Sequence, residues 1–259
     1  MSSPEPKQQV KEYWEQHPCG AADAPVTAGT DEFFESTEVT RATRDDFMDG
    51  IIHFGRYRSK SVLEVGCGIG TDLSRFARAG ARTFGVDITH RGAQLSRDRL
   101  VAESLPGEVI IGDAEHLPFG SNTFDLVYSW GVIHHTPDTR RAAAEMMRVC
   151  RPGGQIITMV YNRRSLVAAQ AWLVYGLARG RPFSPASRLI AEKLESPGTK
   201  VFTRQEAHLL FRTLDERSVR TVVTSWDLRL GRRRFLPRIL RSVVPSRFGW
   251  FMVIQGVKS

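Results

Sequence analysis

The residues best suited to chemistry are two adjacent histidines and several carboxylates at the ends of apolar runs. His134 and His135 follow the apolar run Phe124–Trp130, and an imidazole that titrates near ~6.5 can take a proton from an alcohol or a phenol. Asp87 closes an earlier apolar run, where a carboxylate can accept hydrogen bonds from two adjacent hydroxyl groups. The histidines could instead serve only in loop hydrogen bonds, and Asp87 and Asp113 could simply cap turns.

A glycine-rich turn lies between an expected strand and an expected helix at residues 62–72. An apolar run that contains Glu64 leads into Gly66, Gly68 and Gly70, and residues at helical spacing follow. Glycine lacks a Cβ atom, so such a turn lets the backbone approach a nucleotide-like ligand closely. The acidic residue in the strand and the G-x-G-x-G spacing differ from the dinucleotide fingerprint. The pattern resembles the first motif of the class I S-adenosylmethionine-dependent methyltransferases.

Three further stretches occur in the order and spacing of that family. Residues 112–119 resemble the loop that holds adenine in these enzymes, and Phe124–Trp130 resembles their fourth strand. Residues 149–154 are close to the L-x-P-G-G turn before the fifth strand. Strands and helices alternate from Ser61 onward, which predicts a parallel sheet. The resemblance implies a Rossmann-like α/β fold with a mostly parallel seven-stranded sheet and helices on both faces.

The resemblance also implies S-adenosylmethionine as the cofactor. The glycines would pass under its methionine and ribose portions, and Asp87 would bind the ribose diol. Asp113 would accept a hydrogen bond from the adenine amino group, Ala114 would donate its backbone amide to the ring, and Ile88 would lie against the adenine face. The implied cofactor residues are Glu64, Gly66, Cys67, Gly68, Gly70, Asp87, Ile88, Asp113, Ala114, Glu115, Ser129 and Trp130.

The sequence leaves open which group would remove a proton from the methyl acceptor. His134 and His135 are the candidate catalytic bases. Some members of the family carry an acidic residue after the fifth strand that orients such a histidine, but residues 159–162 contain no carboxylate. This departure weakens the prediction of a histidine–carboxylate dyad. The remaining histidines are scattered without metal-ligand spacing, so no metal site is predicted.

Composition and charge indicate the class of protein. The chain has 259 residues, 41% hydrophobic and 25% charged, as expected of a soluble globular protein with one main domain. Residues 1–7 contain no apolar core, which argues against a secretory signal, and the three cysteines show no metal-ligand spacing, so we expect a cytoplasmic protein.

Arginines crowd the last quarter of a chain whose net charge is +8. They predict either a solvated basic face or contact with an acidic partner.

Periodicity divides the chain into four segments. They are an N-terminal helical lid at 1–60, the cofactor-binding core at 61–161, a helical insertion at 162–202, and the C-terminal part of the same α/β domain at 203–259. Within the lid, helical spacing predicts a short helix at 10–16 and a longer helical segment from Asp31 to Phe54, with Asp45 facing outward. A capping box at Thr203 predicts a helix. The family resemblance implies that the two strands after it pair antiparallel.

The insertion holds the most apolar stretch of the chain. Residues 165–178 are apolar on nearly all sides and too short to span a bilayer, so they must lie against protein, a lipophilic ligand or a partner. In related methyltransferases such additions sit above the active site. We therefore expect this stretch, Leu173 included, to form a lipophilic acceptor wall opposite the helix from Asp31; a homodimer interface is the alternative. The candidate acceptor contacts are Tyr13, Tyr161, Trp172 and Tyr175.

The sequence therefore predicts an enzyme that methylates a small-molecule metabolite or natural product, and we expect methylation at oxygen. C-methylation of a quinone, isoprenoid or enol-type carbon is the alternative. Methylation of RNA or protein has less support, because no RNA-binding module is evident. The acceptor is expected to be lipophilic or aromatic. Residues 232–247 mix arginine with apolar residues and could dock on an anionic membrane surface.

Overall fold

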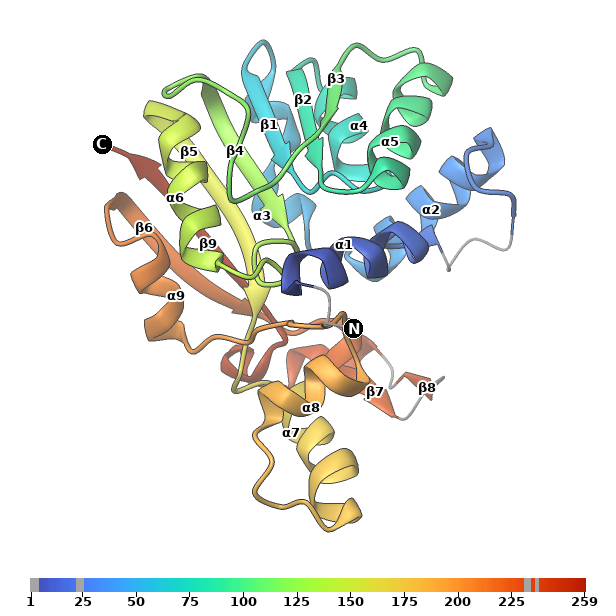
Figure 1. The fold of residues 1–259 in the computed structure, drawn as a ribbon, viewed down its shortest axis with the longest axis vertical. Coiled ribbons are helices and arrows are strands. Elements are labelled where there is room, and N and C mark those ends of the chain that lie inside the picture. The colour runs from blue at the N-terminus through green and yellow to red at the C-terminus, as the bar shows by residue number, and fades with distance from the viewer. Residues whose placement is uncertain (1–4, 22–25, 231–233, 236–237) are drawn as a thin grey trace.

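A seven-stranded sheet forms the centre of the molecule, in the order β3-β2-β1-β4-β5-β9-β6 (Figure 1). The computed structural model describes residues 5–21, 26–230, 234–235 and 238–259. The strands are β1 (Ser61–Val65), β2 (Arg82–Asp87), β3 (Glu108–Ile111), β4 (Phe124–Trp130), β5 (Cys150–Tyr161), β6 (Leu214–Val222) and β9 (Phe251–Lys258). The first five run parallel, and β9 pairs antiparallel with both β5 and β6. The predicted mostly parallel sheet is confirmed.

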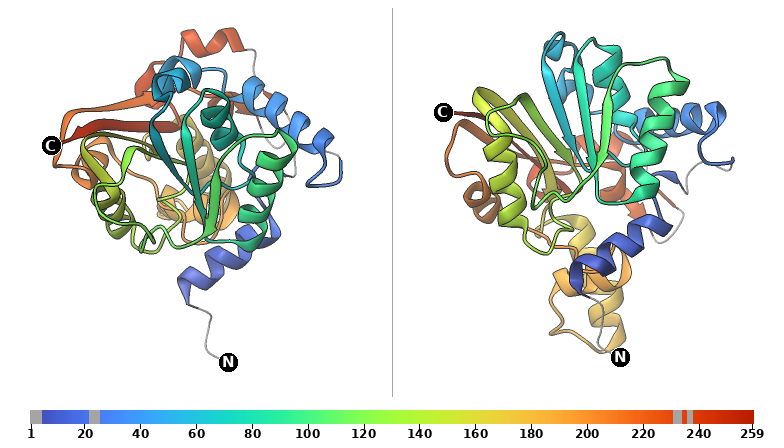
Figure 2. Two further views of the ribbon diagram at one scale, coloured as in Figure 1. Left: turned by 90° about the horizontal axis from the view of Figure 1, so that it is seen from above. Right: turned by 45° about the horizontal axis from the view of Figure 1, so that its top comes forward.

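Helices cover both faces of the sheet, because its inner strands are apolar on both sides. One face carries α4 (Thr71–Arg78) and α5 (His90–Ala102), and the other carries α6 (Thr139–Val149) and α9 (Arg204–Leu210) (Figures 1 and 2). Phe76 of α4 packs edge-on against Tyr128 of β4, while Met146 of α6 and Ile156 of β5 lie in the core on the other side. Helix α9 begins at Thr203 with the predicted capping box.

The N-terminal part consists of short helices rather than one long one. They are α1 (Pro6–Gln16), α2 (Asp31–Arg44), α3 (Asp49–Ile52) and a 3-10 helix (Phe54–Tyr57). The prediction of one helical segment from Asp31 to Phe54 is wrong, since α2 ends at Arg44. Asp45 is buried instead of facing outward, because its carboxylate pairs with Arg41 one turn back at 2.8 Å. The chain turns there and brings Met48 into the core.

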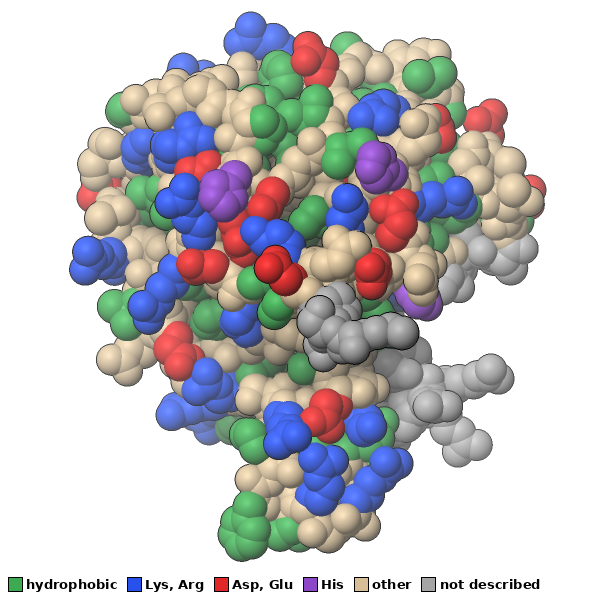
Figure 3. All heavy atoms as spheres, viewed as in Figure 1, with side chains coloured by type: hydrophobic (Ala, Val, Ile, Leu, Met, Phe, Trp, Pro, Cys, Tyr) green, Lys and Arg blue, Asp and Glu red, His purple; other side chains and the backbone are tan. Residues whose placement is uncertain are grey.

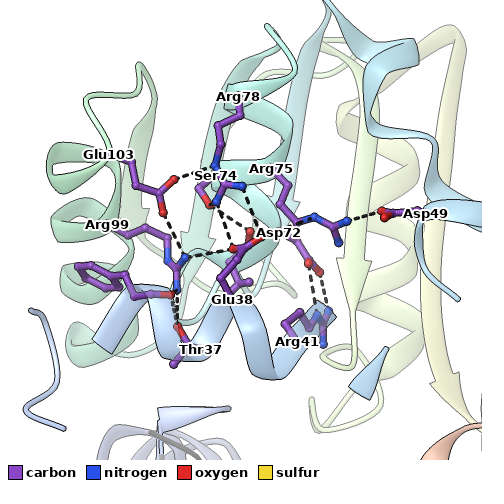
Figure 4. Close-up of polar contacts among 12 residues, drawn as sticks. Thr37, Glu38, Arg41, Asp49, Asp72, Ser74, Arg75, Arg78, Arg99 and Glu103 are labelled. Carbon is purple, nitrogen blue, oxygen red and sulfur yellow. Dashed lines mark hydrogen bonds and ion pairs between the residues drawn. The ribbon is translucent and has the colours of Figure 1, made fainter. Parts of the chain in front are cut away.

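A polar network holds α2 against α4 and α5 (Figure 4). Its centre is the guanidinium of Arg99 in α5, a side chain that is fully buried. Arg99 donates to the hydroxyl of Thr37 at 2.5 Å and to the backbone oxygens of Ile69 at 3.0 Å and Phe34 at 3.3 Å. The carboxylate of Glu38 pairs with the same guanidinium at 3.3 Å. Because Ile69 belongs to the glycine turn, the network ties α2 to that turn.

The insertion after β5 forms a lobe at the foot of the view in Figure 1. It contains α7 (Leu166–Ala171), a π-helical turn (Trp172–Gly176), a 3-10 helix (Leu177–Arg179) and α8 (Ala186–Lys193). The apolar helix expected at 165–178 is present as one continuous helical stretch, 166–179, whose winding changes from α to π to 3-10. Gly176 lets α8 approach, since a Cβ there would stand 3.1 Å from the side chain of Leu189. Leu173 and Leu177 remain 50% and 49% exposed.

The chain between β6 and β9 contains a small second sheet of β7 (Arg229–Leu230) and β8 (Arg234–Phe235), followed by short 3-10 helices. The basic segment that we expected to dock on a membrane, 232–247, lies partly outside the described residues. Within its described part, Arg241 pairs with Asp46 at 2.6 Å. Among the residues that the structure describes, none of the helices has the length and apolar character needed to cross a membrane.

Candidate active site

A cavity of about 1170 Å³ opens at the carboxyl ends of β1, β2, β4 and β5, where open α/β sheets bind their ligands. Helix α1 lies across it and the insertion closes its far end. Small-ligand pockets are typically about 300–1000 Å³, so this cavity has room for two ligands side by side. The predicted site residues that line it are Gly66, Gly68, Asp87, Ile88, Asp113, Ala114, Trp130, His135, Tyr13, Tyr161 and Tyr175.

Asp87 and the glycine turn form the polar end of the cavity. Oδ2 of Asp87 accepts from the amide of Gly68 at 2.9 Å, and Oδ1 accepts from the amide and the hydroxyl of Thr89 at 2.9 and 2.6 Å. Burial raises the pKa of Asp87, and these hydrogen bonds oppose the shift. Gly66 has φ 77°, and a Cβ on it would stand 2.3 Å from Val132. No described atom lies within 4 Å of the corresponding position at Gly68, so a ligand can approach the turn there.

Four of the predicted cofactor residues lie behind the turn instead of lining the cavity. They are Glu64, Cys67, Gly70 and Ser129. One oxygen of the buried Glu64 has no hydrogen-bond partner among the described residues, and burial together with the nearby Asp72 raises its pKa well above the ordinary value. Ser129 donates its hydroxyl to the carbonyl of Val65 at 3.0 Å. These four residues do not line the cavity, and their contact with the cofactor stays a prediction.

The loop after β3 forms the opposite polar wall. Asp113 accepts from the amide of Glu115 at 2.9 Å and pairs with Lys7 of α1 at 2.6 Å. Burial alone would raise the pKa of Asp113, but the contacts with Lys7 and with the Glu115 amide hold it below its ordinary value. Glu115, predicted as a cofactor contact, does not line the cavity. Its carboxylate binds Lys7 at 2.6 Å and accepts from the amide of Asp138 at 2.7 Å.

Helix α1 bridges these two polar walls. At one end Lys7 binds Asp113, and at the other Glu15 accepts from the amides of His90 and Arg91 at 2.9 and 2.8 Å. Those amides begin α5, just after the strand that ends in Asp87. Neither Lys7 nor Glu15 stands out in the sequence, because their partners lie 106 and 75 residues further along the chain.

The other end of the cavity is an aromatic chamber. Tyr161, at the end of β5, stacks on Trp250 with ring centroids 4.1 Å apart, and Phe251 lies 6.0 Å from the same ring. Trp14 of α1 and Tyr175 of the insertion line the same space. Aromatic walls of this kind bury a flat apolar ligand over a large area. We call this end, lined by these five residues, the aromatic chamber.

The two histidines are buried beside the aromatic chamber. Nδ1 of His135 lies 2.9 Å from the hydroxyl of Thr199 and 2.8 Å from that of Ser196. His134 does not line the cavity, and neither of its ring nitrogens has a hydrogen-bond partner among the described residues. Burial, helped by the nearby Lys200, lowers the pKa of both, that of His135 to about 3. Both imidazoles are therefore neutral at physiological pH.

A carboxylate that the sequence did not reveal completes the aromatic chamber. Glu195 follows α8, lines the cavity and interacts with the hydroxyl of Tyr161. The sequence predicted no carboxylate beside Tyr161, because residues 159–162 contain none. Glu195 comes from the insertion, which the family motifs do not cover, so no local spacing could have placed it there.

The acceptor wall predicted on the insertion needs correction. Tyr175 lines the cavity, but Trp172 and Leu173 do not. The π-helical turn directs Trp172 elsewhere, and its indole N–H donates to the carbonyl of Pro182 at 2.9 Å. Val174 lines the cavity in its place. We therefore do not retain Trp172 as an acceptor contact.

Helix α2, expected to face the insertion, reaches the cavity only through its last turns. Among its residues, Arg41 and Arg44 line the cavity. Arg41 pairs with Asp72 at 2.6 Å, and the hydroxyl of Tyr128 donates to the same carboxylate at 2.7 Å. The helix across the aromatic chamber is therefore α1. The described part of the chain contains no cluster of side chains suited to holding a metal ion.

Comparisons with known proteins agree with this geometry. Residues 63–158 match the model of a methyltransferase domain family. The demethylmenaquinone methyltransferase of Thermobifida fusca is 29% identical over 157 residues, 55% of this chain and 66% of that protein. The tocopherol O-methyltransferase of Arabidopsis thaliana is 36% identical over 114 residues, 43% of this chain and 33% of that protein. The chain thus spans between a third and two thirds of the length of these curated relatives.

Solved structures agree in fold. The magnesium protoporphyrin IX methyltransferase of Synechocystis PCC 6803, with S-adenosylhomocysteine bound, matches with a TM-score of 0.61 at 13% identity, over 98% of this chain and 100% of that one. The fold is that of the class I S-adenosylmethionine-dependent methyltransferases. Residues 63–158 match the methyltransferase domain family.

Proposed function

We propose that the protein transfers a methyl group from S-adenosylmethionine to a hydroxyl oxygen of a small, lipophilic, aromatic acceptor. The observation that carries the proposal is one cavity with two unlike ends. One end presents Asp87, Asp113 and the glycine turn, and the other is the aromatic chamber. The bound cofactor supplies a methyl group on a positively charged sulfur. The protein has to place an acceptor oxygen in line with that group and exclude water.

We assign the cofactor to the polar end. Asp87 would accept hydrogen bonds from both ribose hydroxyls, and Gly66 and Gly68 would leave the backbone free to pass under the ribose. Asp113 would accept from the adenine amino group, and Ile88 would cover one face of the ring. The open space at Gly68 and the carboxylates on both walls fit a ligand with a diol and an amino group.

We assign the acceptor to the aromatic chamber, between α1 and the insertion. Residues 1–60 would act as a lid and residues 162–202 as a cap over the acceptor. Tyr161 and Trp250 form one stacked aromatic wall that would bury a flat ring. Tyr13, the acceptor contact that the sequence predicted on α1, lines the same cavity.

The relatives support a lipophilic acceptor. By their names, one acts on demethylmenaquinone and another methylates tocopherol at oxygen. Methylation at a ring carbon is the second candidate. It is favoured by the match with the demethylmenaquinone enzyme, which covers 55% of this chain against 43% for the tocopherol enzyme.

The proposal is tested by product analysis with S-adenosylmethionine carrying a carbon-13 methyl group. The probes are 4-hexylphenol and a reduced demethylmenaquinone with a short prenyl tail. We expect a labelled product whose carbon NMR signal is that of a methyl ether. A labelled ring methyl would move the assignment to C-methylation. If the cofactor binds but neither probe is labelled, the proposed acceptor class is wrong.

A further inference from the structure

We propose that Glu195, in the insertion, is the catalytic base that takes the proton of the acceptor hydroxyl. This inference rests on the proposed methylation at oxygen and names the group that makes the oxygen nucleophilic. It replaces the prediction that His134 or His135 has this role.

The geometry places the carboxylate of Glu195 in the aromatic chamber. Glu195 lines the cavity just after α8, as does Tyr161 at the end of β5, whose hydroxyl lowers the pKa of Glu195. The strand end that carries Tyr161 also carries Met159, which lines the cavity next to Gly131 and Trp130 after β4. Glu195 is therefore at the carboxyl edge of the sheet, where the acceptor must meet the cofactor.

The histidines are less suited to the same task. His134 does not line the cavity. Nδ1 of His135 is held between the hydroxyls of Ser196 and Thr199, and burial lowers the pKa of its imidazolium to about 3. A base whose conjugate acid is that strong holds a proton poorly at neutral pH. His135 can still shape the chamber, where its ring lies 5.2 Å from that of Trp14.

The protonation state of Glu195 suits the task. Burial raises its pKa to about 7, against a smaller opposing effect of the Tyr161 hydroxyl, and a general base works best when its pKa lies near the operating pH. The titratable groups that face it are Tyr161 from β5, Tyr13 from α1 and, beside both tyrosines, Cys19. Lys193, from the end of α8, lines the same cavity.

The proposed step balances in atoms and charge. The acceptor O–H bond breaks, and its proton goes to a carboxylate oxygen of Glu195. The electron pair left on the acceptor oxygen forms the bond to the methyl carbon. The carbon–sulfur bond breaks at the same time, and its pair stays on sulfur. The negative charge of Glu195 and the positive charge of the sulfonium both disappear, and the proton is later released to solvent.

The first test is the pH dependence of 4-hexylphenol methylation by the full chain. In the wild type, turnover should rise as the pH passes about 7, because the carboxylate form of Glu195 is the active one. Glu195→Gln should lower turnover ~10²–10⁴-fold and abolish that rise, with the affinity for S-adenosylmethionine unchanged. Glu192→Gln is the matched control, since Glu192 lies in the last turn of α8, three residues before Glu195, is exposed and pairs with Arg188. It should behave as the wild type.

A second variant separates catalysis from structure. The Tyr161 hydroxyl lowers the pKa of Glu195, so Tyr161→Phe should move the rise in turnover to higher pH. Loss of packing alone would lower turnover at every pH without moving the midpoint. Infrared difference spectra of the wild type and Glu195→Gln, recorded without acceptor, should show a carboxyl group that titrates near pH 7.

The outcomes distinguish this inference from the proposed function. If the wild type methylates 4-hexylphenol and Glu195→Gln does so with the same rate and pH profile, the assignment of Glu195 is wrong and the proposed function stands. If the wild type binds S-adenosylmethionine but methylates neither probe, the acceptor class is wrong and the assignment of Glu195 falls with it.

An independent observation concerns the tip of the insertion. Phe183 is 98% exposed, and Leu173, Val174 and Leu177 beside it in sequence are 46–50% exposed. Residues 172–194 contain four cationic side chains, of which Arg181 and Arg188 pair with Glu192, the single carboxylate of this range. Figure 3 shows Lys and Arg side chains together with hydrophobic ones over this lobe. We call the surface formed by residues 173–183 the insertion tip.

We infer that the insertion tip docks on an anionic lipid surface. Exposed apolar side chains ringed by Lys and Arg match a bilayer interface, where the apolar groups enter the acyl boundary and the cations meet the head groups. The tip is also continuous with the cavity, since Val174, Lys193 and Leu194 both line the cavity and are exposed. A lipophilic acceptor could therefore pass from the bilayer to the aromatic chamber without crossing water.

Vesicle co-sedimentation tests this surface. The wild type should bind vesicles of phosphatidylcholine with phosphatidylglycerol, and more weakly at high salt. Phe183→Ser combined with Leu177→Ser should lower this binding about tenfold or more, whereas Val101→Ser should not, although Val101 on α5 is 79% exposed. Absence of vesicle binding by the wild type would overturn the inference. A dimer in light scattering that the double variant breaks, without vesicle binding, would assign the tip to a second copy of the chain.

Discussion

Asp87 is the single residue on which cofactor binding should depend most. Its carboxylate accepts three hydrogen bonds from Gly68 and Thr89 and faces the open space beside Gly68. In Asp87→Ala we expect calorimetry to show S-adenosylmethionine binding weakened about tenfold or more, because a hydrogen bond to a charged group contributes ~1.5–3 kcal/mol. Asp98→Ala, on the same side of the sheet but outside the cavity, should bind normally. Unchanged affinity in a folded Asp87→Ala variant would contradict the assigned site.

The residues that the sequence located correctly share one property: their positions follow from local motifs. Asp87 ends β2 and Asp113 lies just after β3, and strand ends of a parallel sheet meet at one edge, so both line the cavity. Glu195, Lys7 and Glu15 could not be located in this way. Their partners are distant in sequence, and only the packing of α1 and of the insertion brings them to the site.

Helix α1 should control how fast the cofactor leaves. Lys7 and Glu15 fasten its two ends to opposite walls of the cavity. The ion pair of Lys7 contributes ~0.2–1 kcal/mol and Glu15 adds hydrogen bonds from two backbone amides, so Lys7→Ala combined with Glu15→Ala should speed S-adenosylhomocysteine release up to about tenfold. Stopped-flow tryptophan fluorescence measures this rate. Glu12→Ala, on the same helix, should leave it unchanged, and an equal effect in both variants would argue against the two fastening contacts.

Helix α2 should depend on the buried guanidinium of Arg99. Arg99→Ala leaves the carbonyl of Ile69 without this donor, whereas the carbonyl of Phe34 keeps the Thr37 hydroxyl, and a buried carbonyl left unpaired costs about 1–3 kcal/mol. We expect urea unfolding to show a loss of at least about 2 kcal/mol. Arg78 pairs with the same Glu38 but is 41% exposed, so Arg78→Ala should cost less than about 1 kcal/mol. Equal losses would show that Arg99 acts only as a surface charge.

The helices were harder to predict than the strands. Periodicity predicted α1, although it began that helix at residue 10 instead of Pro6, and a capping box marked the start of α9. It joined α2 to the pieces after it, because the pairing of Asp45 with Arg41 that ends α2 is not visible in an apolar pattern. It placed the helical stretch at 166–179 but could not show the π-helical turn within it, because an apolar run gives no periodicity to mark a change of winding.

At the scale of the whole molecule, the sheet was predictable and the insertion was not. Alternating strands and helices predict a mostly parallel sheet, and β1 to β5 form one. The insertion has no such constraint. The insertion tip is exposed, while Tyr175 and Glu195 line the cavity. The sequence alone did not predict the exposure of the tip or the position of Glu195.

The central claim is that one cavity holds the cofactor at its polar end and a flat acceptor in the aromatic chamber. A crystal structure with S-adenosylhomocysteine and 4-hexylphenol tests it most directly. We predict the adenosine between Asp87 and Asp113, and the phenol ring in the aromatic chamber with its oxygen between the cofactor sulfur and Glu195. A phenol bound outside the aromatic chamber, or an adenosine that contacts neither aspartate, would contradict the account.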